Sequence, residues 1–468
     1  MKRMIMNYLS RFFIGVFCML FFCTHSFAQH ASFQGLGDFP GGSFESSAVK
    51  VSADGLVVVG YGTTVSGQQV FRWTQGTGMV SLGNLPDSSL KNSWAKNISA
   101  DGTVIVGSGD PGSGWNSYRG FRWTQDSGMV NIGSLNGSTR YEAFGVSADG
   151  SVVVGDGGSQ AFRWTQSGGI EGLGVLPGRM NSRAIDVSGD GSVAVGSSYN
   201  LPNWDNEQAF RWTQSDGMVG LGFLPGSNYS FPNAISPDGS VVVGTSSSGS
   251  TYPAFRWTQS TGMVNIGHLS GMNTTHPFDV STNGLTIVGG SFSSPANGEA
   301  FIWDTGHGMR ALKSVLQTEY GLDLTGWSLK AASGISPDGN VIVGWGTNPS
   351  GQQEAFRVVL DTLSTDVHQE KNTGAIEYFR LNQNYPNLFN PSTTIRYSLN
   401  KPSQVKLAIY DLLGQKIRTL KDSFQRAGDY SLVWNTTNEK NIPASSGIYF
   451  YCLQTDEMNL RKKMVLIK

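Results

Sequence analysis

Cysteine and charge are both scarce in this chain of 468 residues. Two of its three cysteines, Cys18 and Cys23, lie in the first 28 residues, so a chain processed after Ala28 keeps only Cys452. One thiol forms no internal disulfide and offers no metal site, and we expect neither a metal nor a cofactor. Charged residues make up 14% of the chain, against about 25% in typical proteins, and the formal net charge is −1. This balance argues against a nucleic-acid partner, because no basic field is present to release counterions.

Long apolar runs are also missing. The run from Phe12 to Cys23 is shorter than the ~20 residues that a membrane-spanning helix needs. Basic residues precede it and Ser26-Phe27-Ala28 follows it, so the pattern predicts a signal peptide over residues 1–28. A lipoprotein signal is the alternative, but bulky Phe22 stands where a small residue is expected. Export leads to an oxidising compartment, where this chain must be stabilised by packing rather than by disulfides.

Glycine is abundant, at 61 residues, and much of it belongs to a repeat of about 47 residues. A complete copy has a Ser-x-Asp-Gly turn, a short β-branched run that ends in Gly, a Phe-Arg-Trp segment and a Gly-Met-Val-x-Leu-Gly segment, and Asn283 replaces the turn Asp in the sixth copy. Short β-branched runs bounded by turn residues are typical of strands, and Asp-Gly favours a tight hairpin. The turn aspartates are Asp54, Asp101, Asp149, Asp190, Asp238 and Asp338, and the tryptophans are Trp73, Trp123, Trp164, Trp212, Trp257 and Trp303.

The first three segments occur in seven copies, but the fourth occurs in only six before the repeats end. The missing copy lies at the other end of the chain, where residues 35–41 match residues 172–178. An N-terminal strand that completes the last sheet joins the two ends of a circular array. The sequence therefore predicts an all-β seven-bladed propeller over residues 29–361, closed beside the Phe356 strand. The alternative, an open solenoid, needs no such shift in phase.

The repeated turn and Phe-Arg-Trp residues are expected to be structural. Alternation along a strand places Phe and Trp on one face, where they fill the space between blades, and Arg on the other. We expect this arginine to pair with a carboxylate or carbonyl of the neighbouring blade. Calcium binding by the Asp-Gly turns is the alternative, but each turn offers one carboxylate where calcium takes about six to eight oxygens.

These residues also resemble a known family. The segments Ala161-Phe162-Arg163-Trp164 with Leu173-Gly174, and Ala254-Phe255-Arg256-Trp257 with Ile266-Gly267, are similar to the extracellular HAF repeat. The likeness extends over residues 29 to about 361, although the customary His before Ala-Phe is absent. The resemblance implies export and repetition, and it implies no activity.

Strand order assigns the connections of each blade to two faces, because alternate connections of an up-and-down sheet emerge at opposite ends. The tight, uniform turns share one face, here called the turn face, and the variable connections share the other, here called the loop face. Functional residues concentrate on loops held by a rigid scaffold, so the loop face is the predicted site for a glycan or protein ligand. The alternative is that its aromatic residues only cover the blade ends. The candidate ligand-binding residues are Trp115, Asn116, Tyr118, Trp204, Asp205 and Tyr252.

No convergent set of carboxylates, or of a nucleophile and a base, stands out from the repeat. His268, His276 and His307 also lack metal-ligand spacing. We therefore expect an interaction module and no enzyme. Two alternatives remain open: a glycan-active hydrolase or lyase with a site on the loop face, and a structural surface protein without a specific ligand.

Composition changes at Asp361, and residues 362–377 are predicted to be a linker. Beyond it, four short runs of alternating residues predict a small Ig-like β-sandwich over residues 378–468. Cys452 alternates in step with Ile448 and Phe450, so we expect its thiol to be buried and inert.

Five motifs in this segment resemble the type A sorting domain of type IX secretion. Leu388 stands where proline is usual. The resemblance implies recognition by an outer-membrane translocon and a location outside, or on the outer surface of, a Gram-negative cell of the Bacteroidota type. A generic adhesive sandwich is the alternative, and we expect a monomer. The motifs are Asn-Tyr-Pro-Asn-Leu-Phe-Asn-Pro-Ser-Thr-Thr-Ile at 384–395, Ile-Tyr-Asp-Leu-Leu-Gly at 409–414, Ala-Gly-Asp-Tyr at 427–430, Ser-Gly-Ile-Tyr-Phe-Tyr at 446–451 and the basic end at 461–468.

Overall fold

The chain forms two compact units, Met1–Ser364 and Thr365–Lys468, in the computed structural model. The predicted signal peptide and linker lie outside the residues that the structure describes. No helix in the described part is long and apolar enough to cross a membrane. The described residues are 31–86, 92–110, 117–201, 206–247, 250–282, 284–294, 297–360, 380–381, 384, 389–399, 401–411, 415–426, 428–455 and 459–467.

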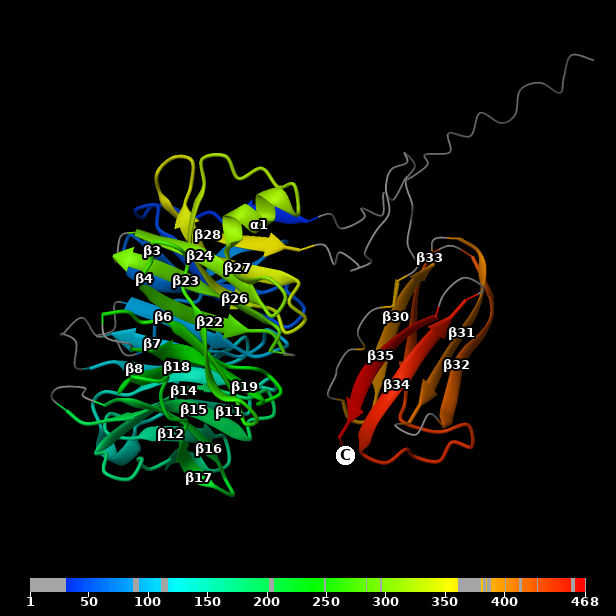
Figure 1. Ribbon diagram of the computed structural model, residues 1–468, viewed down its shortest axis with the longest axis horizontal. Helices are drawn as coiled ribbons and strands as arrows, with labels where there is room; N and C mark the ends of the chain where they lie inside the picture. The colour runs from blue at the N-terminus through cyan, green and yellow to red at the C-terminus, as the bar shows by residue number, and fades with distance from the viewer. Residues whose placement is uncertain are drawn as a thin grey trace, which may run out of the picture. The chain divides into compact units, whose positions relative to one another are not determined.

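The first unit is a ring of four-stranded antiparallel sheets, the blades, of which the described residues form seven (Figure 1). The first strands of successive blades contact one another around the full circle, so they are the innermost strands. Blade 1 contains β2 (Ser46–Val51), β3 (Val58–Thr64), β4 (Gly67–Thr74) and β5 (Gly78–Ser81); blade 2 contains β6 (Asn92–Ile98), β7 (Ile105–Asp110), β8 (Arg119–Thr124) and β9 (Gly128–Asn131); blade 3 contains β10 (Glu142–Val146), β11 (Val152–Asp156), β12 (Ala161–Thr165) and β13 (Gly169–Gly172); blade 4 contains β14 (Asn181–Val187), β15 (Val193–Tyr199), β16 (Gln208–Thr213) and β17 (Gly217–Gly220).

The remaining blades follow the same order except at the end of the ring. Short helices lie in two connections between blades, η1 (Leu135–Gly137) before blade 3 and α1 (Leu312–Thr318) before blade 7. Blade 5 contains β18 (Ser230–Ile235), β19 (Val241–Ser246), β20 (Ala254–Thr258) and β21 (Gly262–Gly267); blade 6 contains β22 (Thr274–Val280), β23 (Thr286–Ser294), β24 (Asn297–Asp304) and β25 (Gly308–Ala311); blade 7 contains β26 (Ser328–Ile335), β27 (Val341–Thr347), β28 (Gln353–Val359) and, from the other end of the chain, β1 (Ser32–Gly35).

The N-terminal strand closes the ring. β1 runs antiparallel to β28, with Gly35 opposite Phe356. Just beyond it, the amide of Leu36 donates a hydrogen bond of 2.8 Å to the carbonyl of Ala355. The ring of Phe33 packs edge-on against Trp327, with centroids 4.9 Å apart. The predicted seven-bladed propeller with N-terminal closure is thus confirmed.

A glycine beneath a phenylalanine forms the centre of each blade. In blade 3, Gly155 lies opposite Phe162, whose side chain is fully buried. A Cβ at Gly155 would meet both that ring and the backbone oxygen of Glu142. The second strand therefore ends its apolar run in Gly because only Gly leaves room for the ring. The fully buried phenylalanines are Phe71, Phe121, Phe162, Phe210, Phe255, Phe301 and Phe356.

Each Ser-x-Asp-Gly turn is held by its own side chains. In blade 2, the Ser99 hydroxyl donates to Asp101 Oδ1 at 2.6 Å, and the amide of Thr103 donates to the same oxygen at 3.0 Å. Burial alone would raise the pKa of Asp101, but these hydrogen bonds outweigh it and hold that pKa below its ordinary value. The same 2.6 Å bond joins Ser52 to Asp54, Ser147 to Asp149, Ser188 to Asp190, Ser236 to Asp238 and Ser336 to Asp338.

Backbone hydrogen bonds also join the turn of one blade to the turn of the next. Pro237 in blade 5 and Pro337 in blade 7 occupy the donor position and have no N–H to give. The circle of turn-to-turn bonds is therefore interrupted between blades 5 and 6 and between blades 7 and 1. The bonds run from Ala53 to Ala100, Ala100 to Ala148, Ala148 to Gly189, Gly189 to Pro237 and Thr282 to Pro337, at 2.8–2.9 Å.

The Phe-Arg-Trp strands connect neighbouring blades through both of their faces. Trp73, Trp123 and Trp212 are buried, and Trp164, Trp257 and Trp303 are half-buried against their cores. On the other face, three arginines donate to the turn carbonyl of the following blade, as the repeat predicted. These bonds join Arg122 to Gly150 at 3.3 Å, Arg256 to Gly284 at 3.1 Å and Arg357 to Gly55 at 3.0 Å.

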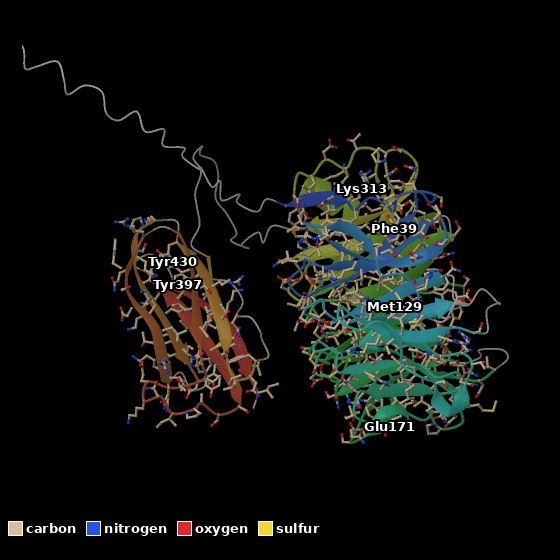
Figure 2. The ribbon with its side chains drawn as sticks, turned by 180° about the vertical axis from the view of Figure 1, so that it is seen from behind. Phe39, Met129, Glu171, Lys313, Tyr397 and Tyr430 are labelled. Carbon is tan, nitrogen blue, oxygen red and sulfur yellow. The ribbon has the colours of Figure 1, made fainter. Side chains whose placement is uncertain are left out.

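The second unit consists of two antiparallel sheets around one core. Tyr397 and Tyr430, on neighbouring strands, stack with ring centroids 5.4 Å apart (Figure 2). Fully buried Trp434 from the first sheet and Tyr451 from the second belong to the same core. The sheets are β29 (Arg380–Leu381), β30 (Thr393–Leu399) and β33 (Gly428–Trp434), and β32 (Lys416–Gln425), β31 (Ser403–Tyr410), β34 (Gly447–Gln454) and β35 (Asn459–Leu466).

The expectation for Cys452 is wrong, because its side chain is partly exposed. Along β34, Tyr449, Tyr451 and Leu453 face the core, and alternation places Cys452 on the opposite face of the strand. Both faces of this strand carry large apolar residues, so the alternation alone did not show which face is buried.

Candidate functional site on the loop face

One layer of residues changes from blade to blade while the layer next to it repeats. The repeating pair is an alanine or proline on the innermost strand opposite the second-strand glycine, such as Ala143 opposite Gly155. The neighbouring pair, one step towards the loop face, differs in each blade; we call these pairs the variable layer. They are Ser47–Tyr61, Trp94–Ser108, Glu142–Asp156, Arg183–Ser197, Phe231–Thr245, His276–Gly290 and Ala331–Trp345.

Charged members of this layer gather between blades 3 and 4. Arg183 donates to the carboxylate of Glu207 at 2.8 Å, and that carboxylate also accepts a bond of 2.5 Å from Ser197. The guanidinium of Arg183 lies over the rings of Phe231 and Tyr199, 4.8 and 5.3 Å from their centroids. Arg183 is therefore fixed in position by an ion pair and two aromatic rings.

Two buried carboxylates lie side by side in the same region. Glu142 stands directly opposite Asp156 in the register of β10 and β11, and Arg140 forms an ion pair of 3.3 Å with Glu142. Burial raises the pKa of Asp156 although the amide of Gly158 donates to it at 2.7 Å. Burial, reinforced by Asp156, also raises the pKa of Tyr199 to about 12. We call Arg140, Glu142, Asp156, Arg183 and Glu207 the charged cluster.

Aromatic pairs flank the charged cluster on the loop face. Tyr118 meets Trp94 edge-on, with centroids 5.9 Å apart, and the guanidinium of Arg140 lies 6.0 Å from the Tyr118 ring. In blade 5, Tyr229 and Tyr252 form a second edge-on pair at 6.2 Å, and 39% of Tyr252 is exposed. The loop face thus combines aromatic rings with arginines and carboxylates.

The six residues predicted to bind a ligand are described only in part. Tyr118 precedes β8 and Tyr252 precedes β20, both in connections of the loop face. Trp115, Asn116, Trp204 and Asp205 lie outside the described residues. Sequence analysis found no convergent carboxylates, and it missed the charged cluster. A comparison of the aligned repeats at the position before the repeating alanine would have revealed Glu142 and Arg183.

A second group of polar and charged residues, the axial cluster, lies on the innermost strands. Each of its members directly follows a β-bulge of its strand. Lys50 in blade 1 forms an ion pair of 2.8 Å with Asp279 in blade 6, and both side chains are 13% exposed. Asp186 in blade 4 accepts hydrogen bonds of 3.1 Å from Asn97 and from the amide of Ile235. Burial raises the pKa of Asp186 to about 6, against the opposing effect of Lys50. Lys50, Asn97, Asp186 and Asp279 make up this cluster.

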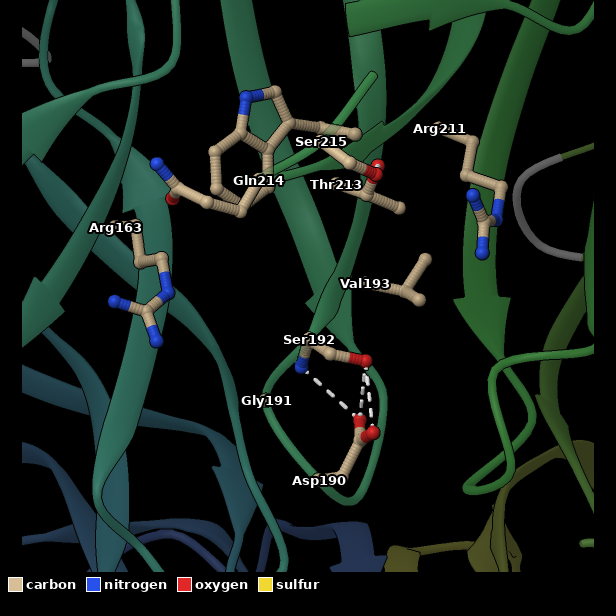
Figure 3. Close-up of a pocket in the computed structure, with 10 residues that line it drawn as sticks. Arg163, Asp190, Gly191, Ser192, Val193, Arg211, Thr213, Gln214 and Ser215 are labelled. Carbon is tan, nitrogen blue, oxygen red and sulfur yellow. Dashed lines mark hydrogen bonds between the residues drawn. The ribbon is translucent and has the colours of Figure 1, made fainter. Parts of the chain in front are cut away.

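An open cavity lies on the turn face, between blades 3 and 4. It has a volume of about 600 Å³, and Figure 3 shows Arg163 and Arg211 on opposite sides of the Asp190–Ser192 turn. Within the described ranges, no three His, Cys, Asp or Glu side chains are grouped so that they could hold a metal ion. The cavity is lined by Arg163, Asp190, Gly191, Ser192, Val193, Arg211, Trp212, Thr213, Gln214 and Ser215.

Comparisons with known proteins found one family model and several similar solved structures. Residues 389–457 match the family model of the FlgD Ig-like domain, and no curated protein matches the chain. A similar solved structure is TolB from Acinetobacter baumannii, with 14% identity, 66% of this chain and 81% of TolB covered, and a TM-score of 0.38. Another is the Cps50 (Swd1) β-propeller domain from Myceliophteria thermophila, with 12% identity, coverages of 70% and 99%, and a TM-score of 0.44.

An oligogalacturonate lyase in complex with manganese is also similar, with 14% identity, coverages of 66% and 75%, and a TM-score of 0.37. At such identities the likeness concerns the fold alone. The chain is a β-propeller followed by an Ig-like domain, an architecture that serves interaction modules as well as enzymes.

Proposed function

We propose that this chain is an exported interaction module that binds a glycan on the loop face of its propeller, over blades 2 to 5. The variable layer carries this proposal. Where packing alone dictates the residue, all blades repeat it, as they do for the buried phenylalanines. One step away, the pair reads Glu142–Asp156 in blade 3, Arg183–Ser197 in blade 4 and Phe231–Thr245 in blade 5. A ring that only had to pack would repeat these positions too.

The chemistry of the loop face suits a sugar. Partly exposed aromatic rings such as Tyr252 offer flat apolar surfaces, and arginines and carboxylates can bind hydroxyl groups through charge-assisted hydrogen bonds. Because Glu207 and two rings fix Arg183, its position is set before a ligand arrives. Preorganisation of this kind lowers the entropy cost of binding.

Removal of the loop-face rings should weaken glycan binding. We expect Tyr118→Ala with Tyr252→Ala, and separately Trp115→Ala with Trp204→Ala, to raise the Kd for a glycan selected on an array by at least about tenfold. Loss of an aromatic anchor costs about 2 kcal/mol. Calorimetry with the selected glycan measures the change.

The matched control is Phe424→Ala, which removes a ring that is 66% exposed in the second unit. It should leave the Kd unchanged. Equal Kd values for the wild type and both loop-face variants would contradict the proposed site, as would the absence of any glycan that binds.

Glycan hydrolysis is the second candidate function, because Glu142 and Asp156 are buried side by side. Burial raises the pKa of Asp156, and a carboxyl group with a raised pKa beside a second carboxylate is an arrangement that acid–base catalysis uses. Incubation of the bound glycan with the protein, followed by analysis for shorter products, separates the two functions. A binding module returns the glycan intact, whereas a hydrolase releases products that Glu142→Gln abolishes.

Export rests on the N-terminal pattern at residues 1–28 and on the sorting-domain resemblance at residues 378–468. Deletion of residues 378–468 should retain the propeller in the periplasm of a host with type IX secretion, whereas the full chain reaches the surface or medium. Cell fractionation with an antibody against the propeller measures this. Surface delivery of the shortened chain at the level of the full chain would refute the proposed route.

A further inference from the structure

One member of the variable layer, His276 in blade 6, lies outside the charged cluster. It stands opposite Gly290 in the register of β22 and β23. A Cβ at Gly290 would lie 2.7 Å from an atom of the Phe292 ring, so the glycine leaves room for that ring beside the imidazole. The ring centroids of Phe292 and Phe278 each lie 6.0 Å from that of His276. The imidazole therefore lies against two phenyl rings, and all three side chains are partly exposed.

The hydrogen bonds of Thr245 fix the tautomer of His276. The Thr245 hydroxyl donates its single proton to the carbonyl of Thr275 at 2.8 Å. The same oxygen lies 3.3 Å from Nδ1 of His276, and with its proton committed it can only accept a hydrogen bond there. The proton of the neutral imidazole is therefore on Nδ1, and Nε2 carries a lone pair. Burial lowers the pKa of His276, which favours this neutral form.

Nε2 of His276 is an acceptor without an internal donor. It forms no hydrogen bond or ion pair with the residues that the structure describes. The side-chain oxygen of Asn233 is also unpaired, but it is buried, whereas Nε2 is open to solvent. A ligand that reaches His276 thus meets an acceptor of fixed position beside two apolar rings.

His276 borders the proposed loop-face site. The amide of Tyr252 donates to the carbonyl of Asn273 at 2.7 Å, and the amide of Thr275 donates to the carbonyl of Tyr252 at 2.8 Å. Thr275 directly precedes His276, so the connection that carries Tyr252 is bonded to the strand of the histidine. A single oligosaccharide that stacks on the exposed ring of Tyr252 can therefore extend to the imidazole.

We propose that His276 recognises the acetamido group of an N-acetylated sugar. This inference rests on the proposed glycan-binding function and names the class of its ligand. An acetamido group carries an N–H, which only donates, and an apolar methyl group. Nε2 accepts a hydrogen bond from that N–H, and the rings of Phe278 and Phe292 pack against the methyl group. A hydroxyl or an ammonium group in its place supplies a donor but no methyl group, so sugars that carry one should bind more weakly.

The test measures the Kd of the full chain by calorimetry for the tetrasaccharide of N-acetylglucosamine, the tetrasaccharide of glucosamine and cellotetraose. We expect the acetylated one to bind about tenfold more tightly than the other two. His276→Phe keeps a ring and removes the acceptor, so the bound N–H is left unpaired and the Kd of the acetylated tetrasaccharide should rise about tenfold. His276→Gln supplies an amide oxygen as acceptor and should recover part of this affinity.

The matched control is His307→Phe, the same substitution on the turn face, where 66% of the histidine side chain is exposed. It should change the Kd by less than twofold, and thermal unfolding should show that all variants are folded. Equal binding of the acetylated tetrasaccharide and cellotetraose refutes the inference, as does an unchanged Kd in His276→Phe or the absence of binding by the acetylated tetrasaccharide.

This inference and the proposed function can fail separately. If a glycan without N-acetyl groups binds and Tyr118→Ala with Tyr252→Ala weakens it, the loop-face site stands and the role of His276 is refuted. If no glycan binds at all, both are refuted.

Discussion

A chain that begins at Leu36 should lose much of the stability of the propeller. It lacks β1, so β28 keeps an unpaired edge and the core around Trp327 loses Phe33. Four residue pairs of backbone ladder and one large side chain together contribute about 5 kcal/mol. In a domain of this size, we expect the midpoint of thermal unfolding to fall by about 7 °C. Circular dichroism and tryptophan fluorescence measure the transition.

A chain that begins at Ser32 keeps β1 and is the control. Addition of a synthetic peptide with the sequence of residues 29–36 to the shortened chain should restore part of the lost stability, since an open sheet edge accepts a strand of matching sequence. An unchanged midpoint in the shortened chain would show that the ring does not depend on its closing strand.

Removal of the same charge at two positions of the axial cluster should have opposite effects. Asp279→Asn leaves Lys50 without its ion-pair partner at 13% exposure, and loss of one partner from such a pair costs about 3 kcal/mol. Asp186→Asn keeps an acceptor for the amide of Ile235 and removes the surplus carboxylate, so that one lysine faces one aspartate. We expect it to stabilise the protein at neutral pH by up to about 3 kcal/mol, the equivalent of a pKa raised from 3.8 to about 6.

The pH dependence gives a second readout for Asp186. Its pKa is higher in the folded state than in the unfolded state, so the folded state holds more protons between pH 3.8 and about 6. The contribution of Asp186 to stability is therefore fully present below this window and is lost as the pH rises through it. Urea unfolding at pH 5 and pH 7 measures this: the free energy of unfolding should fall more between these pH values for the wild type than for Asp186→Asn. Equal destabilisation by both substitutions would contradict this assignment of the charges.

The blades could be predicted because their residues recur for local reasons. Gly155 and Phe162 are needed together, and Ser99 and Asp101 complete a turn within a few residues. Each of these contacts joins residues of one blade that lie close together in the chain. The same residues therefore recur in every repeat, and the repeat can be recognised in the sequence.

The axial cluster could not be predicted in the same way. Lys50 and Asp279 are brought together by closure of the ring, and Asp186 meets Asn97 from two blades away. These contacts depend on the number of blades and on a bulge in each innermost strand, which no short segment encodes. The burial of Cys452 was mispredicted because both faces of its strand carry apolar residues, and alternation alone does not show which of two apolar faces is buried.

Pro237 and Pro337 divide the propeller into two arcs, one of five blades and one of two. Within each arc, backbone hydrogen bonds join neighbouring turns. The two boundaries between the arcs, called seams here, lie between blades 5 and 6 and between blades 7 and 1 and lack such a bond. The seam between blades 7 and 1 is fastened by Arg357 on Gly55 and by β1, and that between blades 5 and 6 by Arg256 on Gly284. Partial opening of the propeller should therefore begin between blades 5 and 6, where no additional strand such as β1 is present. Amide hydrogen exchange should be fastest there.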